Sequence, residues 1–195
     1  MKKTALGLLL ALPLSAQSFE VGAFLGQQLN KDVAVVGTKI EVDSTTVVGF
    51  RFGYSFVDFG PILLQGTLGY QGESKGKVKL DGVEEPGARM KHDHTAIGVM
   101  ANFKAVVAVG AGIEYRMEKL RAVDPSESRS VTYNRPWLRA NLGYALPTPL
   151  LKPFIGLEVA MPLSSTSVSL GSSEDDLLKG LAPKFQIGLY GGIRF

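Results

Sequence analysis

The segment Thr46-Val47-Val48-Gly49-Phe50-Arg51-Phe52-Gly53-Tyr54-Ser55-Phe56 alternates between two kinds of side chain. One face is apolar and mostly aromatic, whereas the other carries valine, glycine, serine and a single arginine. Alternation with period two is typical of a β-strand, because successive side chains point to opposite sides of the sheet. A face exposed to water would carry more lysine and glutamate than the second face does. The segment therefore favours a strand that turns its apolar face to lipid and its glycine-rich face to a narrow interior.

Seven further segments repeat this alternation and are long enough to cross a bilayer when tilted. They are residues 19–26, 62–71, 95–101, 105–117, 137–144, 154–161 and 184–195. We predict an all-β fold, an eight-stranded antiparallel up-and-down transmembrane β-barrel. The alternative is a soluble β-sandwich in which the aromatic side chains fill the core.

The connections between these segments alternate in length. Residues 57–60, 102–104 and 146–152 form short connections, and residues 30–45, 74–94, 118–131 and 164–180 form long ones. Outer-membrane barrels place short turns in the periplasm and long loops outside. We therefore expect four long loops on the outer side and both ends of the barrel on the periplasmic side.

Composition restricts the classes that remain. The chain has 195 residues, of which 23 are glycine and none is cysteine, so disulfides and thiolate chemistry are excluded. Its mean hydropathy of +0.13 is too low for a bundle of membrane helices. The formal charge of +3 falls to +1 without Lys2 and Lys3, which argues against nucleic-acid binding.

The first 18 residues have the layout of a secretory signal peptide. Lys2 and Lys3 precede an apolar run from Ala5 to Leu14, and Ala16-Gln17-Ser18 provides a cleavage site of small residues. The run is too short to span a bilayer as a helix. We predict an exported protein with a signal peptide at residues 1–18, cleaved after Ser18 or Ala16, and a barrel at residues 19–195.

Charged residues recur on the faces that the strands turn inward. The predicted lumen network consists of Glu20, Arg51, Glu114, Arg116, Arg139, Glu158, Lys184 and Arg194. An eight-stranded barrel is just wide enough for side chains to fill it, and buried charges must pair. We expect a salt-bridged lumen that is closed; a gated pore built from the same charges is the alternative.

His92-Asp93-His94 is the only histidine cluster. On an extended chain the two imidazoles share a face, but no third metal ligand is evident, so no metal or cofactor is expected. We expect both histidines to be exposed at the base of a long loop. Either one beside a loop serine would be the only basis for an enzyme, and we expect no catalytic residues.

The end of the chain resembles a known assembly signal. Leu189-Tyr190-Gly191-Gly192-Ile193-Arg194-Phe195 is an alternating last strand with a terminal phenylalanine. Together with the signal peptide and the eight strands, it resembles the small bacterial outer-membrane β-barrel domain family, OmpA/OmpX-like, over residues 19–195. The resemblance implies that the barrel-assembly machinery reads Phe195. Nothing follows the barrel, so no peptidoglycan-binding domain is expected.

These features predict an integral outer-membrane protein with a structural or surface-interaction role. A narrow channel for small solutes and a lipid-modifying enzyme are the alternatives. The expected partners are outer-membrane lipids and the assembly machinery, and the protein is expected to be a monomer. Residues 74–94 carry five basic side chains, which fits contact with lipopolysaccharide phosphates as well as simple solvation.

Overall fold

The computed structural model describes residues 18–35, 37–104, 107–125, 127–146, 148, 151–165, 168 and 171–195. Eight strands form a closed ring in the order β1-β4-β5-β6-β7-β8-β9-β10, and every neighbouring pair is antiparallel. They are β1 (Ser18–Asn30), β4 (Thr45–Phe59), β5 (Ile62–Leu80), β6 (Val83–Phe103), β7 (Ala108–Val123), β8 (Ser128–Ala145), β9 (Lys152–Pro162) and β10 (Pro183–Arg194). The predicted eight-stranded barrel is confirmed. The predicted signal peptide lies outside the described residues except for Ser18, which begins β1.

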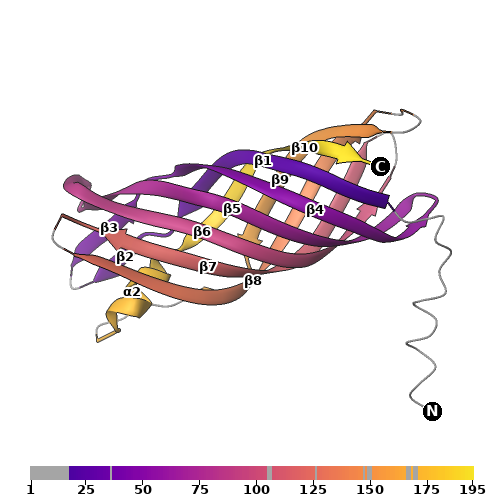
Figure 1. The fold of residues 1–195 in the computed structure, drawn as a ribbon. Helices are drawn as coiled ribbons and strands as arrows, with labels where there is room; N and C mark the ends of the chain where they lie inside the picture. The colour runs from indigo at the N-terminus through magenta and orange to yellow at the C-terminus, as the bar shows by residue number, and fades with distance from the viewer. Residues whose placement is uncertain are drawn as a thin grey trace, which may run out of the picture.

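The barrel is a long cylinder with two different ends (Figure 1). At one end, here called the inner end, Phe19 and Phe195 exchange two backbone hydrogen bonds of 2.8 and 2.9 Å. The opposite, outer end carries the hairpin of β2 (Val33–Val35) and β3 (Thr38–Val42) and the short helix α2 (Glu174–Gly180). β3 pairs with the outer end of β5, so the hairpin extends the wall of the barrel.

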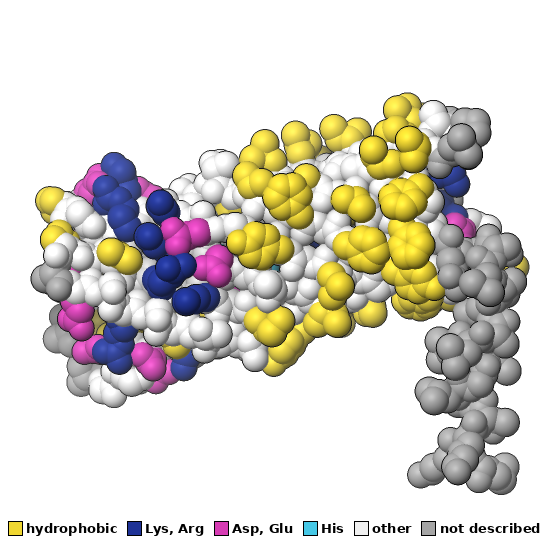
Figure 2. Space-filling view, viewed as in Figure 1, with side chains coloured by type: hydrophobic (Ala, Val, Ile, Leu, Met, Phe, Trp, Pro, Cys, Tyr) yellow, Lys and Arg dark blue, Asp and Glu magenta, His cyan; other side chains and the backbone are white. Residues whose placement is uncertain are grey.

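Large apolar side chains cover the outside of the barrel towards the inner end (Figure 2). Phe50 and Ile155 are each 61% exposed, although each is strongly apolar. The apolar belt includes Val21, Leu25, Val48, Phe50, Leu68, Tyr70, Ile97, Val99, Ile113, Tyr115, Met117, Leu142, Ile155, Leu157, Ile187 and Leu189. Such a continuous apolar surface is typical of contact with lipid. No helix among the described residues is long and apolar enough to span a membrane.

The polarity of the wall reverses above the belt. On β7, Met117 is the last outward side chain of the belt; Lys119 then points outward, and Leu120 is buried inside. On β6, Lys91 faces outward and its neighbour Met90 inward. The side chains that fill the outer end, here called the outer plug, are Val33, Val42, Met90, Leu120, Val131, Leu178, Leu181 and Ala182. This arrangement is the one expected for a wall that has left the membrane and entered water.

Helix α2 supplies the upper part of the outer plug. Ser173 caps the helix, because its Oγ accepts a hydrogen bond of 3.2 Å from the backbone N–H of Asp176. Leu178 points into the barrel mouth, and Leu181 follows at the end of the helix. The helix is held to β8 by ion pairs from Arg129 to Glu174 and Asp175.

Three of the four expected long loops are largely strands: residues 30–45 hold the β2–β3 hairpin, and residues 74–94 and 118–131 continue the strands of the barrel wall. β5 and β6 remain paired as far as Leu80 and Val83 and are joined by an Asp81-Gly82 turn in which both residues have positive φ. β7 and β8 likewise extend to Val123 and Ser128. Alternation continues through these segments with charged residues outside. The many charged residues of these segments are therefore the water-exposed face of an extended wall.

The alternation of connections predicts which end faces the cell exterior. Val83→Cys, beside the turn at the outer end, should react with a membrane-impermeant maleimide on intact cells. Thr148→Cys, in the β8–β9 connection at the inner end, should react only after the outer membrane is permeabilised. Labelling of Thr148→Cys alone on intact cells would show that the barrel has the opposite orientation.

Candidate functional site

The interior of the barrel is lined mainly by two neighbouring strands. Because alternate residues point inward, β7 presents Glu114, Arg116 and Glu118 to the lumen. β8 presents Arg135, Trp137 and Arg139 in the same way. All six are at least 94% buried. The β7–β8 register sets Glu114 opposite Trp137 and Arg116 opposite Arg135, so the charged side chains reach one another across the lumen and along it.

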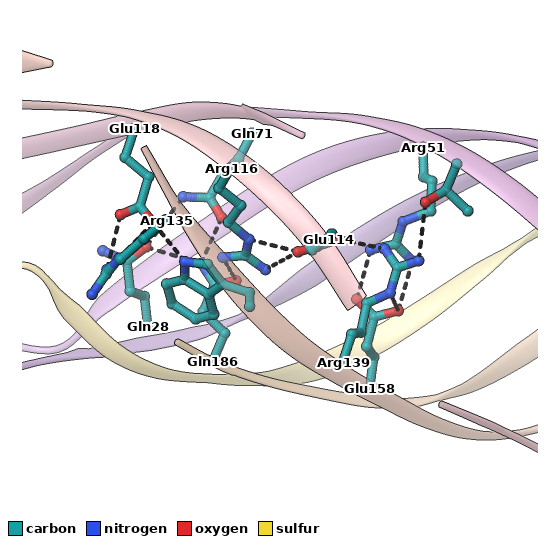
Figure 3. Close-up of polar contacts among 12 residues, drawn as sticks. Gln28, Arg51, Gln71, Glu114, Arg116, Glu118, Arg135, Arg139, Glu158 and Gln186 are labelled. Carbon is teal, nitrogen blue, oxygen red and sulfur yellow. Dashed lines mark hydrogen bonds and ion pairs between the residues drawn. The ribbon is translucent and has the colours of Figure 1, made fainter. Parts of the chain in front are cut away.

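A central cluster joins four strands at the depth of the apolar belt (Figure 3). Arg51 of β4 donates two hydrogen bonds, of 2.6 and 2.8 Å, to the two carboxylate oxygens of Glu158 on β9. Arg139 donates to Glu114 at 2.7 Å, and its Nε lies 3.9 Å from a Glu158 oxygen. Paired hydrogen bonds of this kind are the strongest contacts between arginine and a carboxylate.

Arg116 links the central cluster to a group of glutamines nearer the outer end. Its Nε donates to Glu114 at 2.6 Å, its Nη1 donates to Gln186 at 2.7 Å, and its guanidinium lies 3.8 Å from the centre of the Trp137 ring. Gln186 in turn donates to Gln28 at 3.0 Å and to Gln71 at 2.8 Å. Amide groups therefore continue the hydrogen-bonded network where the charges stop.

Glu118 is the centre of a second ionic cluster and is completely buried. Its carboxylate accepts two hydrogen bonds from Arg135, of 2.8 and 2.9 Å, one from Trp137 at 2.5 Å and one from Tyr133 at 3.0 Å. His92 lies 3.2 Å away on the remaining side. A buried carboxylate is costly unless its oxygens are fully hydrogen-bonded, and this one is.

The inner end holds a third cluster. Glu20 accepts hydrogen bonds from Arg194, at 2.5 and 3.1 Å, and from the hydroxyl of Tyr190. The Tyr190 ring lies against Gly22, where an added Cβ would come within 2.6 Å of the ring. Glycine at that position therefore makes room for an aromatic side chain in the lumen. A cavity of about 50 Å³ lies beside Glu20 and Arg194.

The structure places seven of the eight predicted lumen residues inside the barrel and one outside. Lys184 is exposed, because the β1–β10 register shifts between Leu29, which pairs with Phe185, and Asn30, which pairs with Pro183. The shift turns Pro183 inward in place of Lys184. The described lumen therefore holds four glutamates and five arginines: Glu20, Glu114, Glu118, Glu158, Arg51, Arg116, Arg135, Arg139 and Arg194.

The expected exposure of the two histidines is wrong. His92 and His94 are 2% and 7% exposed and lie inside the barrel, with ring centres 5.6 Å apart. Ser74 donates its hydroxyl to the backbone carbonyl of His92, not to the imidazole. Among the described residues, no three acidic, histidine or cysteine side chains are grouped as metal ligands. The histidines belong to the polar filling of the lumen.

Several members of the network were not predicted from the sequence. Glu118 and Gln28 lie just beyond the ends of the predicted strands, and Arg135 lies just before the start of one, because the apolar alternation that defines those strands stops short of them. The inward alternation continues nonetheless: Glu118 follows Glu114 and Arg116 at a spacing of two. Extending each strand by the alternation of its inward side chains, instead of its apolar outward ones, predicts these residues.

Several solved outer-membrane proteins have a fold similar to that of this chain. No family model matches the chain, and no curated protein matches its sequence. The outer membrane protein OprG from Pseudomonas aeruginosa superposes with a TM-score of 0.58 at 14% identity, covering 92% of this chain and 96% of OprG. A major outer membrane protein from Thermus thermophilus gives 0.55 at 16% identity, covering 92% and 99%. Neisserial surface protein A gives 0.51 at 11% identity, covering 91% and 94%.

The chain has the fold of the small bacterial outer-membrane β-barrels. The match runs through nearly the whole length of each protein, so the resemblance expected from the sequence is confirmed at the level of fold. At 11–16% identity, the likeness is one of backbone architecture. What fills the lumen is therefore a property of this chain's own side chains.

The lumen geometry predicts a large difference between buried and exposed ion pairs. Arg139→Ala would leave Glu114 without one of its two arginine partners and should lower the free energy of unfolding by about 3–5 kcal/mol. Lys77→Ala, which breaks the exposed Lys77–Glu84 pair, should cost about 0–1 kcal/mol. Urea unfolding in lipid vesicles measures both.

A matched double variant controls for loss of packing. Replacing both Arg51 and Glu158 with leucine should restore part of the stability lost in Arg51→Leu alone, because no unpaired charge then remains. Equal unfolding midpoints for Arg139→Ala and Lys77→Ala would mean that water solvates the lumen charges.

Proposed function

We propose that the protein is an integral protein of the bacterial outer membrane with a closed lumen, and that its role is structural or one of surface interaction. The observation that carries the proposal is the continuous filling of the lumen. Three ionic clusters and a group of glutamines occupy the polar part, and the outer plug closes the mouth above them. A protein built in this way presents its outer surface, and not its interior, to other molecules.

Two small cavities inside the described part of the barrel fit a closed lumen. The cavity at the inner end has a volume of about 50 Å³, and a second cavity, beside Arg51, Glu114 and Glu158, has about 30 Å³. Spaces of this size hold only a few water molecules. A hydrated ion would have to displace paired guanidinium and carboxylate groups, which is costly in a barrel this narrow.

A narrow channel is the second candidate, favoured by one observation. The lumen is lined with charged and amide side chains along most of its length, from Glu20 to Glu118, as a water-filled path would be. The two candidates differ in whether these side chains separate. Rearrangement would have to break the central cluster and also lift the outer plug, because the two lie in series along the same path.

We further propose that the protein is not an enzyme. Both histidines are buried in the lumen, away from the position at the outer leaflet where a lipid substrate would meet them. If instead the protein modifies lipid A, the mass of lipid A should differ between cells with and without it.

Conductance in planar bilayers tests the closed lumen. The wild-type protein should give no steady open state. Leu178→Asp with Leu181→Asp, which disrupts the outer plug, and Arg51→Ala with Arg139→Ala, which empties the central cluster, should each stay closed. The combined variant should show transient openings that neither pair shows alone, because it removes two of the barriers in series and leaves the other two ionic clusters and the glutamines as the remaining ones. Heat-modifiable mobility on gels establishes that each variant is folded, and Lys77→Ala with Glu84→Ala is the matched surface control.

A steady, ohmic wild-type conductance would contradict the closed lumen and support the channel.

We propose that the protein is exported by its signal peptide and inserted by the barrel-assembly machinery through β10. Phe195 bonds to the backbone of Phe19, and the two ring centres are 6.1 Å apart, so it completes the seam between the first and last strands. Phe195→Ala should lower the yield of heat-modifiable protein in the outer membrane, whereas Leu151→Ala, a matched exposed apolar residue at the inner end, should not. Equal yields would show that Phe195 is dispensable.

A further inference from the structure

Basic side chains gather on one side of the barrel directly above the apolar belt. They lie on β5, β6 and β7, whose pairing sets Lys75 beside Lys91 and Lys91 beside Arg121. In the adjacent row, Asp93 of β6 lies opposite Lys119 of β7 in the strand register. We call this the outer basic patch: Lys75, Lys91, Lys119 and Arg121, with Glu73 and Asp93 among them, for a net charge of +2. Figure 2 shows such a group of mixed charges beyond the edge of the belt.

The height of the patch matches the headgroup layer. Lys119 lies two residues beyond Met117, the last belt residue on β7, which is about 7 Å along the strand and roughly 5 Å along the membrane normal after tilt. The polar region on each side of the hydrocarbon core is about 5–8 Å thick. Arg121 lies two residues beyond Lys119, and Lys91 lies opposite Arg121, so both are anchored slightly higher on the wall. Their long side chains can reach down to the same layer.

The cluster of basic side chains lies on one side of the barrel, and the exposed Lys184 of β10 is a single basic side chain beyond the belt on another side. On β1 and β4, the first outward residues beyond Leu25 and Val48 are Gln27 and Thr46, which are uncharged and bonded to each other at 3.0 Å. A general need for solubility would not place the basic side chains at this height on three adjacent strands. The position favours a ligand of defined charge that lies at the membrane surface.

Glu73 holds the cations together. Its carboxylate lies 2.7 Å from Arg121, 3.2 Å from Lys91 and 3.8 Å from Lys75. Desolvation alone would raise the pKa of Glu73, but the hydrogen bond from Lys91 and the surrounding positive charges lower it. The three cations carry more positive charge than the single carboxylate of Glu73 can neutralise. A phosphate group, which carries more negative charge than a carboxylate, would be a stronger ionic partner for these side chains.

We propose that the outer basic patch binds the phosphate groups of phosphorylated lipids in the outer leaflet. The proposal rests on the outer-membrane location proposed above and adds a ligand class and a site to it. The apolar belt below the patch would contact the acyl chains of the same lipid, while Lys75, Lys91, Lys119 and Arg121 meet its headgroup phosphates. Free inorganic phosphate lacks the acyl chains and should bind far more weakly.

Native mass spectrometry of the folded barrel in neutral detergent tests the site, with diphosphorylated lipid A as the probe. Replacing Lys75, Lys91 and Lys119 with glutamine should weaken lipid A binding by roughly 100-fold, because each basic side chain at an anionic surface contributes about fivefold. The matched control replaces Lys39, Lys79 and Lys179, which lie towards the top of the outer end, and removes the same charge. It should weaken binding by less than about threefold.

Further binding measurements test whether the phosphate groups of lipid A are what the patch recognises. Lipid A stripped of its phosphates should bind the wild-type protein only weakly, and inorganic phosphate added as a competitor should displace little of the bound lipid A. Glu73→Gln should bind lipid A more tightly, by about fivefold, because the cations lose a competing carboxylate. Raising the salt concentration should reduce binding by the wild type and have little effect on the patch variant.

The outcomes separate the two proposals. Equal losses in the patch variant and in the control would overturn the site, because net charge alone would then explain binding. Equal binding of phosphorylated and stripped lipid A would overturn the phosphate chemistry. In both cases a folded, bilayer-inserted barrel would leave the outer-membrane location standing. A protein that fails to insert into bilayers would overturn the location and the lipid site together.

Discussion

The structure depends on one constraint, which is that an eight-stranded barrel has room only for side chains. Charges that point inward therefore cannot stay hydrated and must find partners within the lumen. Glu118 illustrates the consequence, since five donor groups from four residues surround its carboxylate at 2.5–3.2 Å. Glu114 and Glu158 share Arg139 in the same way. The backbone hydrogen bonds between strands and the ion pairs in the lumen therefore favour the same strand order and register. Another register would separate the ionic partners.

The strands are apolar outside and polar inside within the belt, and this pattern is reversed near the outer end. Within the belt, β7 is apolar outside and charged inside, from Ile113 to Glu118; one step higher, Lys119 is outside and Leu120 is inside. The reversal is the one expected for a wall that contacts lipid in its lower part and water in its upper part. Apolar side chains excluded from the upper surface collect inside it and form the outer plug with α2. The outer end therefore has the core of a small soluble protein built on a membrane barrel.

This reversal explains what the sequence could and could not predict. The strand from Thr46 to Phe56 was predictable, because its outward face stays apolar throughout the membrane. Residues 74–94 were expected to be a loop, since an apolar outward face identifies a membrane strand in the sequence and that face ends at the membrane boundary. His92 and Glu118 were missed or misplaced for the same reason. Lys184 was misplaced for another reason: a register shift beside Asn30 breaks the alternation locally, and no composition signal marks it.

The level at which the outward side chains change from apolar to polar links the two proposals, the closed lumen and the lipid site. A lumen closed by paired charges and an apolar plug leaves the outer surface as the part of the molecule available to partners. On that surface, apolar residues give way to polar ones at the level that we assign to the lipid headgroups, and the basic side chains of β5, β6 and β7 stand there. Lysines at this level keep their stems against the belt and their charges in the headgroup layer. The outer basic patch would thus hold the barrel at a fixed depth while its paired-strand extensions reach beyond the lipid surface.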